Sequence, residues 1–477
     1  MVDNALITFV FFSLFMLSVS FVFDQKREKE LDEMIKRQKV QINSETVGII
    51  VVNSSSTIFQ KIYSNIEGVN EKTPFILGSV SKSFTALGLS KLDILPNTTL
   101  EDFDLGDYLD EDSIKKITVG ELLTHTSGLD SFSNKIIGEK GYFSYSNYGY
   151  ALLGKIIEKK SGRKYNEFMK ENIFDKLNMV NTHAIYNSSI IDSYLNLFGF
   201  NIKYRSLESE IDDGFDTPAG YISSSIEDMG IYLRYYLNNT DYLNQMFKSE
   251  IGYNKDYGGW LFIQNRTDQT VYEHGGETYS FLSQIYIFPD LNLAFAVLTN
   301  TVDFYNIVYL FLAFIKNIEN FLVNDVYEEI NDSVYFYTHF TMDMITIIVI
   351  SIPLTYFIIT LIRKIKRKPY LWFKGIKGII IFVVDVLLLF ILPIFILIIS
   401  FGIQSIVKLA IAAINDFYFM VIVISVTLLS TFIIKLIYCL LYKKYSNSNK
   451  KYNSKRDASL SDLIDMNDDL WNNIFSL

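Results

Sequence analysis

Apolar positions in the middle of the chain follow two different periodicities. Strand-like apolar runs cover residues 47–52, 258–263, 281–288 and 293–298, and helical periodicity fills the segment between the first two. Strands from the start and the end of this segment are expected to pair in one largely antiparallel sheet, with helices packed on it and a separate helical lobe. The pattern predicts an α/β (α+β) domain over residues 47–325, with a site in the cleft between sheet and lobe.

Four mostly apolar runs outside that domain have the length of helices that cross a bilayer. They cover residues 5–23, 344–362, 378–401 and 417–441. The first run predicts an N-terminal transmembrane anchor, and a cleavable signal peptide is the alternative. The other three predict a C-terminal bundle of transmembrane helices.

Polar segments separate these parts of the chain. One of them alternates charges with Leu31, Met34 and Ile35, which is typical of a short solvated helix or stalk. The expected order is an anchor or signal peptide (1–24), a charged stalk (25–46), the α/β domain (47–325), a linker (326–343), three transmembrane helices (344–442) and a tail (443–477).

Lysine and arginine near the apolar runs predict the orientation, since positive residues beside transmembrane helices stay on the cytoplasmic side. They crowd residues 363–377 and 443–456, whereas the intervening loop holds only Lys408. This distribution places the tail in the cytoplasm and the α/β domain outside it, in a multi-pass protein of the cell membrane. Basic residues between 26 and 39 favour the opposite orientation. The C-terminal signal is given the greater weight.

Composition narrows the classes of partner and cofactor. The 477 residues carry a formal net charge of −10 and are 49% hydrophobic. Such a chain offers no basic face for nucleic acid, and its apolar content favours a lipid bilayer as a partner. Cys439 is the only cysteine, and the four histidines stand far apart. No metal or other cofactor is therefore expected.

The candidate chemistry begins with an S-x-x-K arrangement. Ser79 and Lys82 precede a helical apolar pattern. Positions i and i+3 of a helix share a face, so the Lys82 amine can approach the Ser79 hydroxyl and help to remove its proton. A serine at a helix N-terminus also directs backbone N–H groups toward a developing oxyanion.

The sequence around this pair resembles the class C β-lactamase and low-molecular-weight penicillin-binding protein family. Residues 75–86, F-I-L-G-S-V-S-K-S-F-T-A, are similar to the nucleophile motif of that family. Four further blocks follow in the family's order: L-L-T-H-T-S-G-L at 122–129, Y-S-N at 145–147, P-A-G-Y-I-S-S-S at 218–225 and H-G-G at 274–276. The resemblance implies a serine β-lactamase/DD-peptidase-like fold and chemistry through an acyl-enzyme.

Two residues of the second and third motifs receive roles beside the nucleophile. Tyr145 is the candidate that shares proton transfer with Lys82, because an ammonium stabilises a nearby phenolate and lets it act as a base. Asn147 donates and accepts at once, which suits holding a substrate amide near Lys82. No glutamate has a supporting motif for deacylation, so that step is assigned to Tyr145 and Lys82 as well.

The block around His274 is expected to line the substrate site from the sheet. Gly275 and Gly276 lack side chains where a substrate backbone would approach. The resemblance implies that the N–H groups of Glu277 and Ser79 form the oxyanion hole. Relatives carry K-T-G or H-x-G here, and an imidazole in place of the fixed ammonium of the K-T-G form weakens the anchoring of a substrate carboxylate at neutral pH. Efficient β-lactamase activity is therefore not expected.

These residues predict a membrane-bound serine hydrolase acting on amide or ester bonds. The expected substrates are small peptide or acyl compounds, especially peptides with D-amino acids of the cell-wall type. The alternative is a catalytically weak penicillin-binding or sensor module that signals through the transmembrane helices. A third hypothesis is a transport or immunity protein in which the membrane helices carry the function. It depends on Pro393 and on Asp385, a carboxylate inside an apolar run, where it is unfavourable unless it is paired or functional.

Overall fold

A computed structural model describes residues 25–330, apart from 110–111, 198–199, 205–213, 242–256, 259–260, 266–268 and 303–309. Farther along the chain it describes parts of 344–362, then 375–394 and 423–437. The chain divides into two compact units, Met1–Phe336 and Tyr337–Leu477. Each unit is considered by itself.

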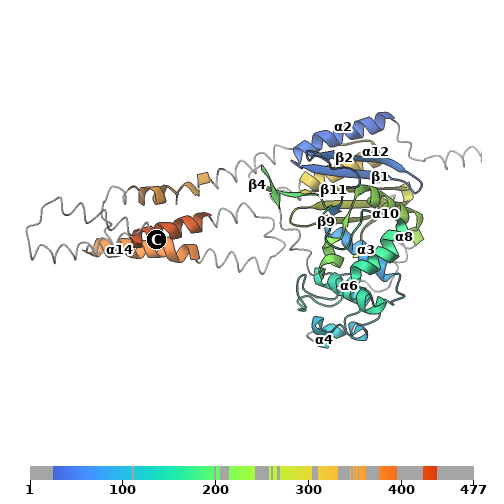
Figure 1. The fold of residues 1–477 in the computed structure, drawn as a ribbon, viewed down its shortest axis with the longest axis horizontal. Coiled ribbons are helices and arrows are strands. Elements are labelled where there is room, and N and C mark those ends of the chain that lie inside the picture. The colour runs from blue at the N-terminus through green and yellow to red at the C-terminus, as the bar shows by residue number, and fades with distance from the viewer. Residues whose placement is uncertain are drawn as a thin grey trace, which may run out of the picture. The chain divides into compact units, whose positions relative to one another are not determined.

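A seven-stranded sheet forms the centre of the first unit (Figure 1). Its order is β2-β1-β11-β10-β9-β8-β7, so strands from the start and the end of the segment lie side by side. β1 pairs antiparallel with β11 from Val47↔Thr299 to Val52↔Ala294, as the apolar runs predicted. The strands are β1 Thr46–Val52, β2 Thr57–Ser64, β7 Tyr257–Gly258, β8 Leu261–Asn265, β9 Thr270–Glu277, β10 Leu282–Phe288 and β11 Leu293–Thr299.

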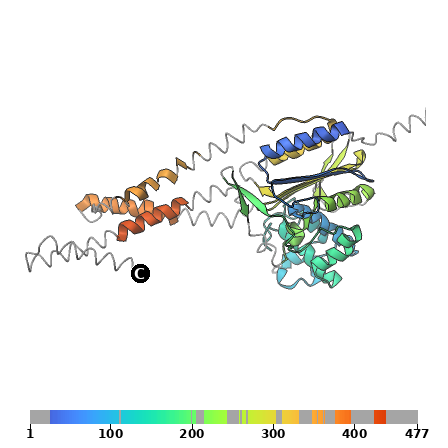
Figure 2. The same cartoon turned by 45° about the horizontal axis from the view of Figure 1, so that its top comes forward.

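Helices cover both faces of this sheet (Figure 2). α10, Ile226–Asn238, packs on β1 and β11 and begins at Ser225, whose side chain accepts the N–H of Asp228 as an N-cap. α2, Gln25–Gln41, and α12, Leu312–Asn324, lie next to each other on the opposite face. All residues of β1, β10 and β11 are consequently buried.

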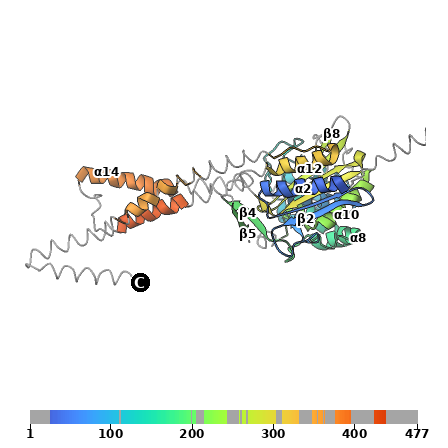
Figure 3. The ribbon, with the colours of Figure 1, turned by 90° about the horizontal axis from the view of Figure 1, so that it is seen from above.

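The charged N-terminal segment differs from the expected free stalk. It is helical, as predicted, but Leu31, Met34 and Ile35 are fully buried, and Figure 3 shows α2 alongside α12 over the sheet. The Arg27 guanidinium donates to the carbonyl oxygens of Phe321 at 3.1 Å and Leu322 at 3.0 Å. An apolar stripe with charges on the other faces suits a helix packed on a globular surface. The folded unit thus begins before residue 47.

The helical lobe lies on the α10 side of the sheet, as Figure 1 shows. α3 packs against α6 and the π-helical turn η5, and α5 and α7 also contact α6. The helices and turns are α3 Ser81–Leu89, α4 Asp112–Lys115, α5 Val119–Leu123, α6 Asn147–Ser161, α7 Tyr165–Met169, α8 Asp175–Leu177, η1 Gly78–Val80, η2 Leu100–Phe103, η3 Gly106–Tyr108, η4 Lys170–Phe174, η5 Thr217–Tyr221 and η6 Pro289–Leu291.

Two small sheets complete the first unit. β3, Phe75–Ile76, pairs antiparallel with β6, Ser223–Ser224, and so connects the segment before Ser79 to the segment before α10. β12, Thr301–Val302, pairs parallel with β4, Ser193–Leu197, which pairs antiparallel with β5, Phe200–Tyr204. One hydrophobic core runs from the sheet into the helical lobe and fixes the two relative to each other.

The second unit contains helical segments in its described residues. α14, Gly375–Val386, continues into the π-helical turn η8, Leu387–Ile391, and a further helix covers 423–437. None of the described helices combines the length and the apolar character needed to span a membrane. The run at 5–23 and the tail at 443–477 lie outside the described residues, and the three C-terminal runs and the linker fall there in part.

Asp385 has a partner in this second unit. Lys435 donates to its two carboxylate oxygens at 2.9 and 2.8 Å, and the Tyr356 hydroxyl donates to one of them at 3.0 Å. Asp385 and Lys435 are 4% and 3% exposed. The Asp385 carboxylate is therefore an ion-paired group. Of the two interpretations of an acid in an apolar run, a paired carboxylate or a functional site, the structure favours the first.

Candidate active site

Ser79 lies in the turn η1, which leads directly into α3. The preceding Gly78 has a φ of +52°, and a Cβ on it would lie 2.4 Å from the backbone nitrogen of Glu277. A side chain at that position would both strain the backbone and collide with β9. The Ser79 turn therefore rests directly against the C-terminal end of β9. This contact brings the nucleophile motif to the H-G-G motif.

The Ser79 hydroxyl is shared by two side chains. Lys82 Nζ lies 3.1 Å and the Tyr145 hydroxyl 2.8 Å from Ser79 Oγ. Lys82 also donates to Asn147 Oδ1 and to the carbonyl oxygen of Ala219, each at 2.6 Å. The three protons of its ammonium form thus each have an acceptor. The structure brings together four residues that the sequence motifs identified, Ser79, Lys82, Tyr145 and Asn147.

Burial sets the protonation of this group. Lys82 is completely buried, and desolvation lowers its pKa well below 10.5, although the nearby negative charge of Asp216 acts in the opposite direction. Burial raises the pKa of Tyr145, and its hydrogen bond to Ser79 offsets only part of this rise. The expected phenolate at Tyr145 is therefore disfavoured. A neutral Lys82 amine is the better base in this geometry.

The loop before α6 positions Tyr145 and Asn147. Ser146 is the N-cap of α6, where its side chain accepts the N–H of Gly149 at 3.0 Å and donates to the carbonyl oxygen of Asp130 at 2.8 Å. The side-chain N–H of Asn147 donates to Ser131 Oγ at 3.3 Å, and this orientation points Asn147 Oδ1 toward Lys82. The helix start thereby holds the Y-S-N motif at the nucleophile.

His274 precedes β10, as expected, and itself lies within the neighbouring strand β9, where it pairs with Ile285. It is 2% exposed, its Nε2 is 3.3 Å from the Tyr257 hydroxyl and its Nδ1 is 2.5 Å from the carbonyl oxygen of Gly275. Burial, followed by the positive charge of Lys82, lowers its pKa from 6.5 to about 3. The imidazole is neutral at ordinary pH. It belongs to an aromatic cluster with Tyr257 and Phe262.

The other residues of the H-G-G block lie at the end of β9. A Cβ on Gly276 would lie 2.0 Å from the carbonyl oxygen of Leu77, so this glycine permits the close packing of β9 on the nucleophile turn. Gly275 is exposed, and a Cβ on it would meet the side chain of Gln284 at 2.9 Å. Glu277 remains open to solvent, yet partial desolvation raises its pKa. The roles of Gly275, Gly276 and Glu277 toward a substrate remain predictions.

Several site residues received no role from the sequence. Ala219 lies in the P-A-G-Y-I-S-S-S block but contributes only a backbone oxygen, and Tyr257 is one of 32 tyrosines. Asp216 acts on Lys82 through charge alone. Their positions depend on tertiary packing, which no local pattern records.

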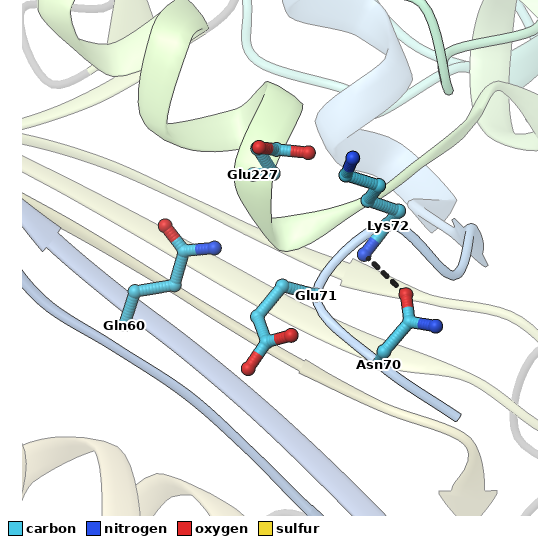
Figure 4. Close-up of a pocket in the computed structure, with 5 residues that line it drawn as sticks. All are labelled: Gln60, Asn70, Glu71, Lys72 and Glu227. Atoms are coloured by element: carbon cyan, nitrogen blue, oxygen red, sulfur yellow. Dashed lines mark hydrogen bonds between the residues drawn. The ribbon is translucent and has the colours of Figure 1, made fainter. Parts of the chain in front are cut away.

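Elsewhere in the described part of the chain, a pocket of about 430 Å³ is lined by polar residues (Figure 4). None of them belongs to the hydrogen-bond network around Ser79. The lining residues are Gln60, Asn70, Glu71, Lys72 and Glu227. Within the same described residues, no group of three or more His, Cys, Asp or Glu side chains is arranged to hold a metal ion.

A mixed sheet-and-helix fold, with a Ser–Lys pair at a helix start and a Tyr–Asn motif facing it, is the arrangement of β-lactamase-type proteins. The profile of the family described as Beta-lactamase matches residues 31–307, more than half of the chain. The chain belongs to this family. The match begins within α2, in keeping with the packing of that helix on the sheet.

Curated relatives agree with this assignment. The chain is 27% identical over 256 residues to Beta-lactamase-like protein 2 of Dictyostelium discoideum. The aligned region covers 45% of this chain and 46% of that protein. It is 24% identical over 320 residues to Protein flp of Staphylococcus aureus (strain MRSA252), covering 57% and 63%. The chain thus covers less than two thirds of the length of both relatives.

One solved structure supports the fold. The Beta-lactamase/D-alanine Carboxypeptidase from Yersinia pestis, complexed with citrate, superposes with a TM-score of 0.51 at 14% identity, covering 62% of this chain and 99% of that one. At this identity the similarity establishes a shared fold and nothing finer. Catalytic members of the Beta-lactamase family are serine hydrolases, whereas some other members have no catalytic activity, so an acyl-enzyme hydrolase is the class of activity to test here.

Proposed function

We propose that this chain is a serine hydrolase that forms an acyl-enzyme on Ser79. The observation that carries the proposal is the position of Ser79, a half-buried residue whose hydroxyl lies within hydrogen-bonding distance of both Lys82 and Tyr145. Desolvation lowers the pKa of Lys82 well below 10.5, which makes its neutral amine form more accessible beside this hydroxyl. A reachable nucleophile, a base and a second proton carrier are the parts that acyl transfer requires.

In the proposed acylation, Ser79 Oγ attacks the substrate carbonyl carbon while its proton passes to the Lys82 amine. The backbone N–H groups of Ser79 and Glu277 stabilise the tetrahedral oxyanion. Collapse of this intermediate breaks the bond to the leaving amine or alcohol, which receives a proton through the Tyr145 hydroxyl. Water then attacks the acyl-enzyme with Lys82 and Tyr145 again moving its protons, and Ser79 is released.

The proposed substrates are amides or esters, above all short peptides that contain D-amino acids, including cell-wall stem peptides. The neutral imidazole of His274 gives no fixed positive charge at the end of β9. Strong anchoring of a free carboxylate by this residue is therefore not expected, and small esters and β-lactams are secondary candidates.

Covalent labelling tests the proposal directly. Membranes that contain the full-length chain are treated with a fluorescent penicillin or a fluorophosphonate, and the Ser79→Ala variant serves as the matched control. Labelling of the wild-type chain that is lost in Ser79→Ala is expected, because only the hydroxyl is removed from a preformed helix start. Labelling without turnover of peptides or esters would favour the sensor module. Equal labelling of both chains would contradict the mechanism.

We further propose that the chain is anchored in the cell membrane with its catalytic unit outside the cytoplasm. The apolar runs and the basic C-terminal segments support this proposal, as do large exposed aliphatic side chains on α14, such as Ile376 and Ile379. A cysteine at Ser133 should react with an impermeant maleimide on intact cells, whereas one at Ser454 should react only after lysis. The reverse pattern would place the catalytic unit in the cytoplasm.

A further inference from the structure

His125 hydrogen-bonds the backbone on both sides of Tyr145. Its backbone oxygen accepts the N–H of Ser144 at 2.7 Å, and its side-chain Nδ1 accepts the N–H of Ser146 at 3.1 Å. One residue thus binds the backbone on both sides of Tyr145. His125 adopts a φ of +55°, an uncommon conformation for a residue with a side chain, and it is fully buried. A strained, buried residue of this kind is held by its surroundings.

The imidazole of His125 also packs on the phenol ring of Tyr145. The ring centroids of His125 and Tyr145 are 4.2 Å apart, and those of His125 with Tyr257 and Tyr150 are 4.9 and 5.1 Å apart. The Tyr145 ring in turn lies under Lys82 Nζ at 4.8 Å. His125 therefore constrains both the backbone and the ring of the tyrosine whose hydroxyl meets Ser79.

Only the neutral imidazole performs this function. Because Nδ1 accepts the Ser146 N–H, the single proton of the ring must reside on Nε2. That atom is buried and has no hydrogen-bond partner among the residues that the structure describes. Desolvation, followed by the electrostatic influence of Lys82 and His274, lowers the pKa of His125 well below 6.5. A protonated ring would lose the acceptor and add a buried charge beside Lys82.

We propose that His125 is a positioning residue that holds the Tyr145 hydroxyl against Ser79 and thereby sets the rate of acylation. The inference rests on the proposed hydrolase function, and it gives the L-L-T-H-T-S-G-L turn a part in catalysis beyond that of a scaffold. His125 hydrogen-bonds neither Ser79 nor Lys82 in the described structure. Its contacts with the backbone and the ring of Tyr145 are the route by which it acts on Ser79.

The test separates positioning from packing. His125→Phe keeps a ring of similar size but removes the acceptor for the Ser146 N–H, whereas His125→Asn keeps an acceptor and tolerates a positive φ. Labelling of the full-length chain by a fluorophosphonate is followed over time at several probe concentrations, which resolves the maximal rate from the concentration dependence. His183→Asn is the control for a substituted histidine outside the network, and urea unfolding checks that each variant folds.

We expect His125→Phe to lower the maximal labelling rate at least tenfold, with the half-saturating concentration changed by less than about twofold, because small displacements of catalytic groups cost rate and not binding. His125→Asn should recover most of the rate. In a Tyr145→Phe background, His125→Phe should cause no further loss. Two independent, multiplying losses would overturn the inference in favour of a general packing role. Absence of labelling in the wild-type chain would overturn the proposed function and this inference with it.

Discussion

Acidification should destabilise the first unit because His274 is held there as a neutral ring. Burial, and then the charge of Lys82, lowers its pKa from 6.5 to about 3. As the pH falls, the unfolded chain binds the proton before the folded chain does, so protonation favours unfolding. The contribution of this residue to stability is therefore complete above pH 6.5 and is lost progressively as the pH falls from there toward 3.

The size of this effect follows from the two pKa values. At roughly pH 4.5 the unfolded imidazole is almost fully protonated and the folded one is not. The two pH units below 6.5 then correspond to about 3 kcal/mol of stability lost from one residue. That is a large fraction of the roughly 5–15 kcal/mol typical of a folded domain. Burial lowers the pKa of His125 in the same direction, so both rings contribute over this range.

Urea unfolding of the full-length chain in detergent, followed by circular dichroism between about pH 8 and pH 4.5, measures this effect. His274→Asn should lose about 3 kcal/mol of the pH dependence that the wild-type chain shows. His183→Asn is the matched control, since this imidazole is only half-buried and its pKa is lowered less far. Parallel pH profiles for the wild-type chain and His274→Asn would show that the ring is not held neutral and would refute the argument.

Two further predictions concern the nucleophile turn. Lys82→Ala and Tyr145→Phe should each slow covalent labelling of Ser79 at least tenfold. The double variant should be little slower than the worse single variant, because both groups act on one hydroxyl. Labelling rates of all three variants test this, and losses that multiply would show that the groups act separately. Gly78→Ala should prevent folding or labelling, whereas Gly68→Ala, which also has a positive φ but open space around it, should cost only about 1 kcal/mol in urea unfolding.

The sheet could be predicted where burial leaves a simple pattern. β1 and β11 are buried along their whole length, so their sequences are continuous apolar runs, and their pairing was predicted correctly. β9 was not predicted as a strand, because its sequence T-V-Y-E-H-G-G-E mixes charges and glycines that serve the packing of the nucleophile turn. α2 was predicted as a helix, but its docking on the sheet depends on a partner, α12, almost three hundred residues away.

The site divides in a similar way between local spacing and tertiary packing. The contact of Lys82 with Ser79 follows from a separation of three residues on a helix. The contact of Tyr145 spans 66 positions and was expected only from the resemblance to a family. The protonation of Lys82, Tyr145 and His274 depends on burial. The phenolate expected at Tyr145 shows what the sequence cannot predict. The motif reveals the neighbouring Lys82 cation, which would stabilise a phenolate, but it does not reveal the desolvation that raises the pKa of Tyr145.

The ion pair of the second unit yields a prediction that sequence alone could not make. Because Asp385 and Lys435 are paired, removing either charge should lower the stability of the unit. Asp385→Asn leaves the buried Lys435 ammonium without its carboxylate, and Lys435→Gln leaves the carboxylate without its cation. Each single variant should lose about 3–5 kcal/mol of stability, whereas the double neutral variant should lose clearly less than the sum. The same cycle on the exposed pair Lys26–Glu30 should give a coupling below about 1 kcal/mol. Thermal unfolding of the full-length variants in detergent measures both cycles, and additive losses at Asp385 and Lys435 would show that the two groups do not stabilise each other.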